Sequence, residues 1–337
     1  MRTETRVLFD QYSQRLAQLN GITDPSKAFT IAPSVQQTME GRIQQSSAFL
    51  SAINMIGVND MQGQKIGVGV GGTIAGRTDT SGDGVRSPSN PAALTDNSYK
   101  CEQTDFDTAL TYAQLDAWQR QGNFKPLVRD AIVQRQALDR IMIGFNGIMA
   151  AATTNRATNP LLQDVNIGWL QKYRTHAPAR VMTGGKTPGV IKVGGEDSDY
   201  ANLDALVMDA VATLIEPWYA QDPNLVVILG RELIHDKYFP IINKDNAPTE
   251  QLAADLVLGA KRIGGLRPAD VPFMPSNAIM VTSLTNLSLY WQIGGRRRHV
   301  EEEAKKNRVV NYESSNDAYV VEDYGFGCVI ENIKVGD

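Results

Sequence analysis

Glycine, acidic and hydroxyl residues gather in three short stretches that resemble sites for phosphates or metal ions. The first, GVGVGG at 67–72, matches the G-x-G-x-x-G pattern, in which a helix N-terminus holds the pyrophosphate of a dinucleotide. That chemistry requires a helix directly after the glycines, whereas TIAGRTDTSGDG follows here and does not favour a helix. We therefore predict a glycine-rich strand that permits close packing against another chain. A cytoplasmic nucleotide-binding enzyme is the alternative from a different class, and a nucleotide-binding assay separates the two.

The other two stretches match their motifs only in part. GGKT at 184–187 resembles the end of a phosphate-binding loop, but Arg180 occupies the position of that loop's first glycine. The segment from Asp79 to Gly84 matches the first half of a calcium loop, yet the twelfth position holds Asn90 instead of glutamate. We predict a surface turn at the first stretch and a solvated loop tip at the second.

Histidine and cysteine are too few and too scattered to suggest a metal site or a nucleophile. The three histidines, His176, His235 and His299, show no ligand spacing, and no G-x-S-x-G motif is present. Cys101 and Cys328 lie far apart in the sequence, which argues against a disulfide framework and fits a reducing cytoplasm. The sequence therefore predicts no catalytic residue, no cofactor and no bound metal.

The composition is that of an ordinary folded protein. The 337 residues are 42% hydrophobic and 21% charged, which indicates a buried core and about two domains. The net charge of −4 argues against strong binding to DNA phosphates and leaves only weak, non-specific contact open. Charges near the N-terminus argue against a signal peptide, and no apolar run is long enough to cross a membrane. We expect a protein made and folded in a cytoplasm, with no membrane partner.

The two N-terminal helical segments have thin apolar faces. Residues 2–20 are expected to form one helix, and residues 35–53 a second helix with Ser34 as its N-cap. The apolar side of the first helix consists of Leu8, Tyr12, Leu16 and Leu19. Because so few apolar residues cannot hold a helix alone, both segments need another surface to pack on. The stretch from 21 to 33 is expected to be an exposed linker.

Residues 60–104 are rich in glycine and small polar residues and read as a long two-stranded loop. A strand is expected at 65–75, a polar tip at 79–91 and a return strand at 98–111. Each arm would reach about 50–65 Å at about 3.3 Å per residue. Since an isolated hairpin is only marginally stable in water, such a loop makes physical sense if it lies on a neighbouring subunit.

Residues 124–150 have the strongest helical pattern in the chain, a rod of about 38 Å. The core contacts of this helix are expected to be Leu127, Leu138, Ile141 and Phe145, and the same apolar face includes Ala131, Met142 and Ile148. The arginines Arg129, Arg135 and Arg140 are placed elsewhere on the helix.

The remaining sequence mixes helices and strands without regular alternation, which indicates an α+β fold. Helices are expected at 165–173, 203–215, 231–236 and 249–260, and strands at 190–193, 225–230, 278–282 and 287–291. The run RRRHVEEEAKKNR at 296–308 has mixed charge and is expected on the surface. Residues 309–335 alternate in the manner of strands.

Six long strings of the sequence are distinctive. They are GQKIGVGVGGTIAGRTDT at 63–80, GFNGI at 144–148, NPLLQDVNIGWLQKYRTHAPARVM at 159–182, DYANLDALVMDA at 199–210, LIEPWYAQDPNLVVILGRELIHDKYFPIINK at 214–244 and NYESSNDAYVVEDYGFGCVIENIKVGD at 311–337. In these strings the chain closely resembles the major capsid proteins of the peduovirus-type phages, which are temperate phages with contractile tails. The resemblance runs through nearly the whole sequence and is far more specific than any short motif.

The resemblance implies the Johnson fold, also called the Hong Kong ninety-seven fold. Its expected parts are an N-terminal arm at 1–59, an extended β-hairpin loop at 60–104, a peripheral domain at 105–185 with a long spine helix at 124–150, an axial domain at 186–295, and a return to the peripheral domain at 296–337.

The resemblance also implies a function in assembly instead of catalysis. Such a protein self-assembles as hexamers and pentamers into the icosahedral head that encloses the phage's double-stranded DNA. Its implied partners are further copies of itself, a scaffold-protease, a portal at one vertex, and decoration or head-completion proteins, with packaged DNA contacted only non-specifically. It would assemble in the host cytoplasm and end in the virion. A cellular shell protein of the same fold that encloses cargo enzymes is the nearest alternative, and the particle's contents distinguish the two.

Two segments receive specific expectations from the resemblance. The loop tip is expected to contact a neighbouring subunit through Arg77, Asp79, Asp83 and Arg86. A partner protease is expected to remove residues 1–33, which would act as a scaffold-like segment. The cut is placed in the linker, where proteases reach exposed chain, at Phe29, Thr30, Ile31, Ala32, Pro33 and Ser34.

Overall fold

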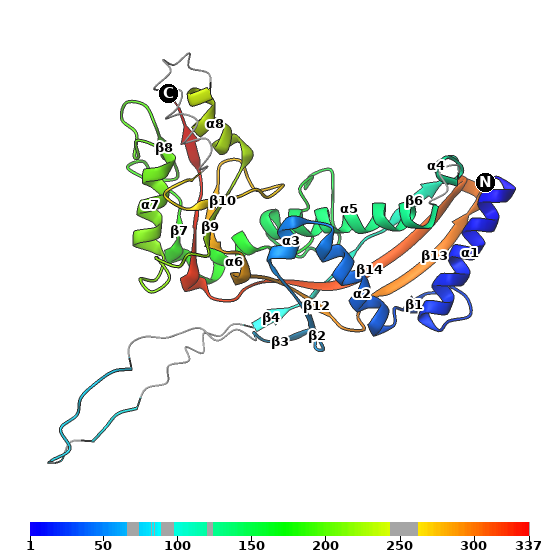
Figure 1. Cartoon of the computed structure of the whole chain (residues 1–337), viewed down its shortest axis with the longest axis horizontal. Coiled ribbons are helices and arrows are strands. Elements are labelled where there is room, and N and C mark those ends of the chain that lie inside the picture. Colours follow the sequence, from blue (N-terminus) through cyan, green and yellow to red (C-terminus); the bar gives the residue numbers. More distant parts are fainter. Residues whose placement is uncertain are drawn as a thin grey trace.

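The computed structural model describes residues 1–65, 74–81, 83, 85–88, 98–119, 124–242 and 262–336. Helices and two main β-sheets occur together, which confirms the α+β prediction. The two sheets occupy different parts of the molecule, and the described outer residues of the 60–104 loop lie well away from both (Figure 1). The helix predicted at 249–260 falls outside the described residues.

The larger sheet has seven strands in the described residues and is built around one long strand, β14 (Arg308–Val321). Along one edge of β14, β12 (Leu287–Gln292) and β13 (Arg297–Glu303) follow each other end to end. The other edge pairs with β5 (Glu102–Asp105) and β6 (Thr108–Thr111). The sheet is completed by β1 (Phe29–Thr30) beside β13 and β2 (Asn54–Val58) beside β12.

The smaller sheet combines strands from distant parts of the sequence. Its strand order is β10 (Arg267–Ala269), β9 (Leu225–Leu229), β11 (Ile279–Ser283), β15 (Gly327–Ile330) and β7 (Val181–Met182). The helix α7 (Leu203–Leu214) contributes the buried Leu206 and Val207 to the same apolar cluster as β9 and β11. Next to this sheet, the C-terminal β16 (Ile333–Val335) pairs with β8 (Ile191–Val193).

These pairings group two segments differently from the expected domain division. Residues 287–295, for which the resemblance implies the axial domain, begin with β12, which lies in the larger sheet. Residues 327–335, for which the resemblance implies the peripheral domain, contain β15 and β16, which pair with β11, β7 and β8. The chain thus passes between the sheets at 284–286 and again at 322–326. Sequence pattern identifies a buried strand but not its pairing partner, and this explains both differences.

The helices of the described residues differ from the prediction mainly at their ends. Besides α7 they are α1 (Thr3–Asn20), α2 (Pro33–Gln45), α3 (Ala48–Ala52), α4 (Tyr112–Gln119), α5 (Phe124–Asn146), α6 (Trp169–His176) and α8 (Arg231–Ile242). The predicted helix at 35–53 is divided in two, because the Ser47 side chain caps a new helix. Ser34 is not an N-cap, because Pro33 is already the first helical residue. The helix expected from 165 begins only at Trp169.

The long helix α5 ends at Asn146, before the predicted position 150. Ile148 therefore lies beyond the helix and is 44% exposed, instead of lying on its apolar face. Near this end, a Cβ atom on Gly144 would come within 2.2 Å of the Trp169 ring. The glycine is required because α5 and the Trp169 side chain pack against each other without space for a methyl group.

The expected core residues of α5 have different environments. Ile141 and Phe145 are buried, with exposures of 0% and 2%. Leu138 is half-buried, and Ala131, which the sequence places on the same face, is exposed. The side chain of Leu127 lies outside the described ones. Burial is therefore deepest toward the C-terminal half of the helix.

Aromatic rings join the helices to the larger sheet. The Phe145 ring centre lies 5.4 Å from that of Phe49 in α3 and 5.3 Å from that of Trp169 in α6. Trp169 in turn meets Tyr319 of β14 edge to face at 5.2 Å, and its indole N–H donates to the Ser288 carbonyl at 3.1 Å. Edge-to-face pairs of this kind add to the stabilisation that burial already provides.

Phe145→Ala is expected to lower the free energy of unfolding by about 3–5 kcal/mol, because it removes a buried ring and leaves a cavity between two other aromatic rings. Leu138→Ala should lower it less, because part of Leu138 is already in water. Chemical unfolding of the purified full-length subunit measures both effects. Arg129→Ala, on the exposed side of the same helix, is the control. Equal losses in all three variants would contradict the assigned faces of α5.

Candidate functional site

The stretch GGKT at 184–187 forms a turn that does not suit a phosphate. The Asp199 carboxylate accepts hydrogen bonds from the backbone N–H groups of Lys186 and Lys192, at 2.6 Å and 2.8 Å. These are the kind of donors that a phosphate would need, and the carboxylate there would also repel an anion. The GVGVGG stretch at 67–72 lies outside the described residues.

The cysteines are placed where they cannot react. Cys101 and Cys328 are both unpaired and 0% exposed, and burial raises the pKa of each thiol to about 12. Neither forms a nucleophilic thiolate at neutral pH. Within the described ranges, no three His, Cys, Asp or Glu side chains gather closely enough to hold a metal ion. Among the same residues, no helix has the length and apolar character needed to span a membrane.

The described residues of the 60–104 loop, which we call the extension, lie in two places, at a root against the body and in an outer part far from it (Figure 1). Its root is a short ladder formed by β3 (Gln62–Gln64) and β4 (Ser98–Lys100). The return strand expected at 98–111 is not one strand, because β5 and β6 pair with β14 in the larger sheet. Of the strands within 98–111, only β4 belongs to the extension. The strand predicted at 65–75 falls largely outside the described residues.

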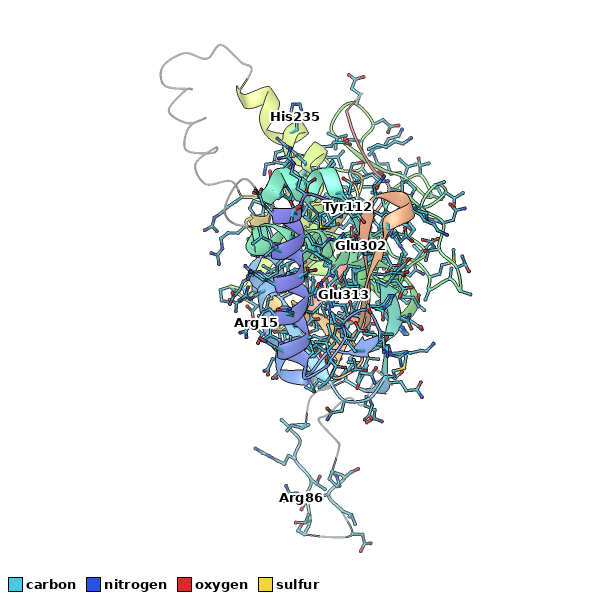
Figure 2. The ribbon with its side chains drawn as sticks, turned by 90° about the vertical axis from the view of Figure 1, so that its right-hand side faces the viewer. Arg15, Arg86, Tyr112, His235, Glu302 and Glu313 are labelled. Carbon is cyan, nitrogen blue, oxygen red and sulfur yellow. The ribbon has the colours of Figure 1, made fainter. Side chains whose placement is uncertain are left out.

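The tip of the extension carries its side chains into solvent. The four predicted contact residues are all exposed: Arg77, Asp79, Asp83 and Arg86. The structure does not bring them into one cluster; Asp79 instead accepts hydrogen bonds from the N–H and hydroxyl of Ser81, at 2.9 Å and 2.6 Å. Ile74 and Val85 are 67% and 84% exposed, and Figure 2 shows Arg86 far from the body. Apolar side chains held out in this way leave water only if something beyond this chain covers them.

The root of the extension is fixed by aromatic packing. Tyr99 in β4 is 7% exposed, and its ring meets Tyr290 of β12 edge to face at 5.1 Å. The Tyr99 hydroxyl also donates to the Asp60 carbonyl at 3.3 Å. Gly63, opposite Tyr99 in the ladder, leaves room for the ring, since a Cβ atom there would lie 3.0 Å from that hydroxyl. The extension therefore starts from a fixed place on the larger sheet.

The N-terminal helix α1 lies against one end of the larger sheet (Figure 2). Arg6 forms a two-pronged ion pair with Glu302 of β13, with both N–O distances at 2.7 Å. The Tyr12 hydroxyl accepts a hydrogen bond from Arg298 at 2.9 Å. Leu19, which the sequence places on the packed face, is instead 47% exposed. Polar contacts to β13 therefore add to the apolar packing of Leu16 in holding α1 in place.

The linker after α1 is not exposed throughout, which corrects the expectation for the segment 29–34. The first two residues of this segment, Phe29 and Thr30, form β1 and pair with β13. Ile31 is 1% exposed and its N–H donates to the Arg296 carbonyl at 2.9 Å, and α2 begins two residues later. Exposed side chains are concentrated at 23–28 instead. The prolines and polar residues of this segment predict an exposed linker, and no sequence pattern predicts the short strand β1 between the two prolines.

A group of charged side chains lies buried between α2, α5 and the larger sheet. We name it the buried charge network, and its members are Glu40, Arg140, Arg296, Arg298, Glu313 and Asp317, each at most 8% exposed. Three guanidinium groups thus face three carboxylates. A buried set of charges must be close to neutral and well hydrogen-bonded, because removing each ion from water is costly.

Glu40 is the centre of this network. Its two carboxylate oxygens accept hydrogen bonds from Arg140 and Arg296, the latter at 2.6 Å. Arg140 also donates to Asp317 at 2.9 Å, and Arg296 to Glu313 at 2.7 Å. Since Glu40 belongs to α2, Arg140 to α5, and both other carboxylates to β14, the network fastens the N-terminal segment to the helix and the sheet. Moving α2 away would leave two buried arginines without a shared partner.

The charges shift one another's titration strongly. Burial raises the pKa of Glu313, but Arg296 and Arg298 oppose it and lower the pKa to about 2. The same opposition acts on Glu40, where burial is outweighed by Arg140 and Arg296 and the pKa is lowered. Both carboxylates are therefore ionised at neutral pH despite their burial.

The sequence also matches a known family over almost its whole length. Residues 8–333 match the family described as phage major capsid protein, P2 family. The chain belongs to this family. The capsid protein of Escherichia phage P2 is 52% identical over all of this chain and 96% of its own length. The major capsid protein of Serratia phage KSP20 is 42% identical over 99% of this chain and 97% of its own length. A chain from the procapsid of satellite phage P4, a structure that includes the size determination (Sid) protein, is 50% identical with a TM-score of 0.83, over all of this chain and 99% of that chain.

The buried charge network of this phage major capsid protein is not apparent from simple sequence patterns. The sequence places Arg140 off the apolar face of α5 and the run 296–308 on the surface, yet Arg140 and Arg296 are fully buried. One signal was available in β14, where polar residues occupy alternate positions: Asn311, Glu313, Ser315 and Asp317. Alternate positions share one face of a strand, and a polar row in a central strand requires partners.

The capsid protein is expected to lose stability in acid between about pH 4.5 and about pH 2, in part through Glu313. Because the pKa of Glu313 is lower in the folded state, its contribution is complete above the unfolded value and disappears as pH falls through the folded value. That contribution is about 3 kcal/mol. Denaturant unfolding at pH 7, 4 and 2.5 measures it. Glu313→Gln should show a correspondingly smaller loss across this range, and identical pH profiles for both proteins would contradict the assignment.

Proposed function

We propose that this capsid protein self-assembles as hexamers and pentamers into the icosahedral head that encloses the phage's double-stranded DNA, and that its role is structural, not enzymatic. The observation that carries the proposal is the extension, which holds exposed apolar side chains away from the body. A projecting element on one copy and a receiving surface on the next make a head-to-tail contact, and a constant rotation between copies closes such contacts into rings. Rings of six and of five copies can tile a closed shell.

The parts of the fold support a division of roles in that shell. We assign the larger sheet to the peripheral domain and α5 to its spine helix. The smaller sheet with α7 is assigned to the axial domain, around which the rings form. Residues 1–59 with α1, α2 and α3 form the arm, and the 60–104 extension is the extended loop. Many contacts of this kind on each copy would together bury far more surface than one ordinary interface.

The proposed partners follow from the same assignment. They are further copies of the chain, a scaffold-protease during assembly in the host cytoplasm, a portal at one vertex, and decoration or head-completion proteins on the finished head. Packaged DNA would be contacted only weakly, because the net charge of −4 offers little attraction for phosphates.

Electron microscopy and nuclease digestion of particles from infected cells test this function. The expected result is closed icosahedral particles of this chain whose DNA is protected from nuclease. Particles filled with an enzyme cargo in place of DNA would overturn the phage-head assignment in favour of a cellular shell. A small soluble oligomer that binds nucleotide would overturn assembly itself.

Removal of the N-terminal segment is a further part of the proposal. We expect a partner protease to cut within 23–34, after which α1 leaves the particle. The exposed residues 23–28 are the most accessible place, and a cut at 29–34, which the sequence predicts, requires β1 to separate from β13 first. Intact-mass measurement of DNA-filled heads decides the point. A subunit mass of the full 36.9 kDa would rule out cleavage while leaving the capsid function untouched.

A further inference from the structure

The extension makes a second contact with the body through Lys65, directly after β3. The Lys65 ammonium donates a hydrogen bond to the Val321 carbonyl at 2.5 Å and lies 4.6 Å from the centre of the Tyr324 ring. A cation over an aromatic face is attracted by the ring's negative face, and more so when it is partly removed from water. Lys65 is half-buried, and burial lowers its pKa to about 8, so the charged form still predominates at neutral pH.

The surroundings of the ammonium combine attraction and repulsion. Glu322 and Asp323, on the segment that follows β14, attract Lys65, whereas Lys172 of α6 repels it. The carboxylates compensate part of the cost of burying the cation. They do not compensate all of it, since the pKa of Lys65 stays below its ordinary value, so the hydrogen bond to Val321 and the Tyr324 ring are what hold the ammonium in place.

The two partners of Lys65 lie where the chain passes from one sheet to the other. Val321 is the last residue of β14, and Tyr324 begins the short helical turn that precedes β15. The Tyr324 ring is itself fixed by Tyr173 of α6, which is fully buried and meets it edge to face at 5.2 Å. Lys65 thus binds the root of the extension to the segment that joins the larger and smaller sheets.

We propose that Lys65 is a positioning residue that sets the direction in which the extension leaves the body, and with it the efficiency of shell assembly. The proposal rests on the function proposed above for the extension. The described residues between Lys65 and β4, which lie within 74–88, make no hydrogen bond, ion pair or aromatic contact with the body. No contact with the body holds these residues in place, so their position depends on the root of the extension, and a misplaced tip misses the neighbouring copy.

A distance measurement on the full-length, unassembled subunit tests the proposal. Nitroxide labels on Val85→Cys at the tip and Met208→Cys on α7 report the tip's position by double electron–electron resonance, since both sites are exposed. The native thiols do not interfere, because both are buried and their pKa values are raised. The test variants are Lys65→Met, which keeps the aliphatic stem, and Lys65→Arg, which keeps the cation. Lys100→Met in β4 is the matched control, because its ion pair with Glu102 lies on the other strand of the root.

Lys65→Met is expected to broaden the distance distribution and to lower the ratio of docked to undocked root by about tenfold, the size expected for a lost cation–π contact and hydrogen bond. The yield of closed shells should fall with it. Lys65→Arg should restore both, and Lys100→Met should change neither. An unchanged distance distribution or an unchanged shell yield in Lys65→Met would overturn the proposal. Normal shells formed by a chain that lacks the loop tip would instead overturn the proposed role of the extension itself.

Discussion

Arg140→Met is expected to lower the free energy of unfolding of the capsid protein by about 3–5 kcal/mol, the cost of breaking a buried ion pair by removing one partner. Methionine retains much of the apolar volume of the side chain but none of its hydrogen bonds. Asp317 loses its guanidinium partner, and Glu40 is left with Arg296 alone. A carboxylate buried without a cation costs far more than a lost surface pair. Urea unfolding of the full-length subunit at pH 7 measures the effect.

Two further variants show whether the loss comes from the buried charge. Arg135→Met, on the same helix, removes an ion pair with Asp139 whose arginine is 53% exposed, and should cost no more than about 0.5 kcal/mol. Arg140→Lys keeps the charge but lacks the planar fork that reaches both carboxylates, and should lie between the other two. If Arg140→Met is no more destabilising than Arg135→Met, the network does not hold the N-terminal segment in the way described.

Deletion of residues 76–92 is expected to abolish closed shells while leaving the subunit folded. The described side chains of this stretch are exposed and make no contact with the body, so the core loses nothing when they are removed. The neighbouring copy, by contrast, loses the tip that would cover part of its surface. Negative-stain microscopy and sedimentation measure assembly, and thermal unfolding followed by circular dichroism measures the fold.

A second variant separates the reach of the loop from its chemistry. Replacing residues 76–92 by a glycine–serine segment of equal length keeps the reach but removes Arg77, Val85 and Arg86. Shells should again fail, because a flexible chain without apolar or charged side chains gains little on contact and loses its freedom. Normal heads from the deletion variant, or an unfolded subunit, would contradict the interpretation of the loop.

Elements with strong local periodicity were predictable from the sequence. LVVILG at 225–230 predicted β9, and the apolar rows at 124–150 and 203–215 predicted α5 and α7. Both ends of each element lie within a few residues of the prediction. Ends were less predictable, because a single side chain decides them. Ser47 starts α3 inside what the pattern presents as one continuous helix.

Local sequence patterns did not predict which strands pair or which charged side chains are buried. Leu287 and Ile279 both lie in apolar strands, and nothing in either strand says that the first belongs to the larger sheet and the second to the smaller one. Arg296 stands in a run of charges that is typical of an exposed surface, and it is buried only because Glu40 and Glu313 arrive from distant segments. The tip residues could be placed in solvent from composition, but what they touch depends on a second copy.

The end-to-end arrangement of β12 and β13 along β14 has a mechanical consequence. The rungs from Leu287 opposite Val321 to Glu303 opposite Arg308 form a nearly continuous ladder along one edge of a strand of 14 residues. A pull along that strand loads these rungs in shear, so all of them share the force, whereas a pull across it would unzip them one by one. The wall of a pressurised container is under tension within its own surface. If β14 lies in that surface, the larger sheet bears the tension in the direction in which its hydrogen bonds resist best.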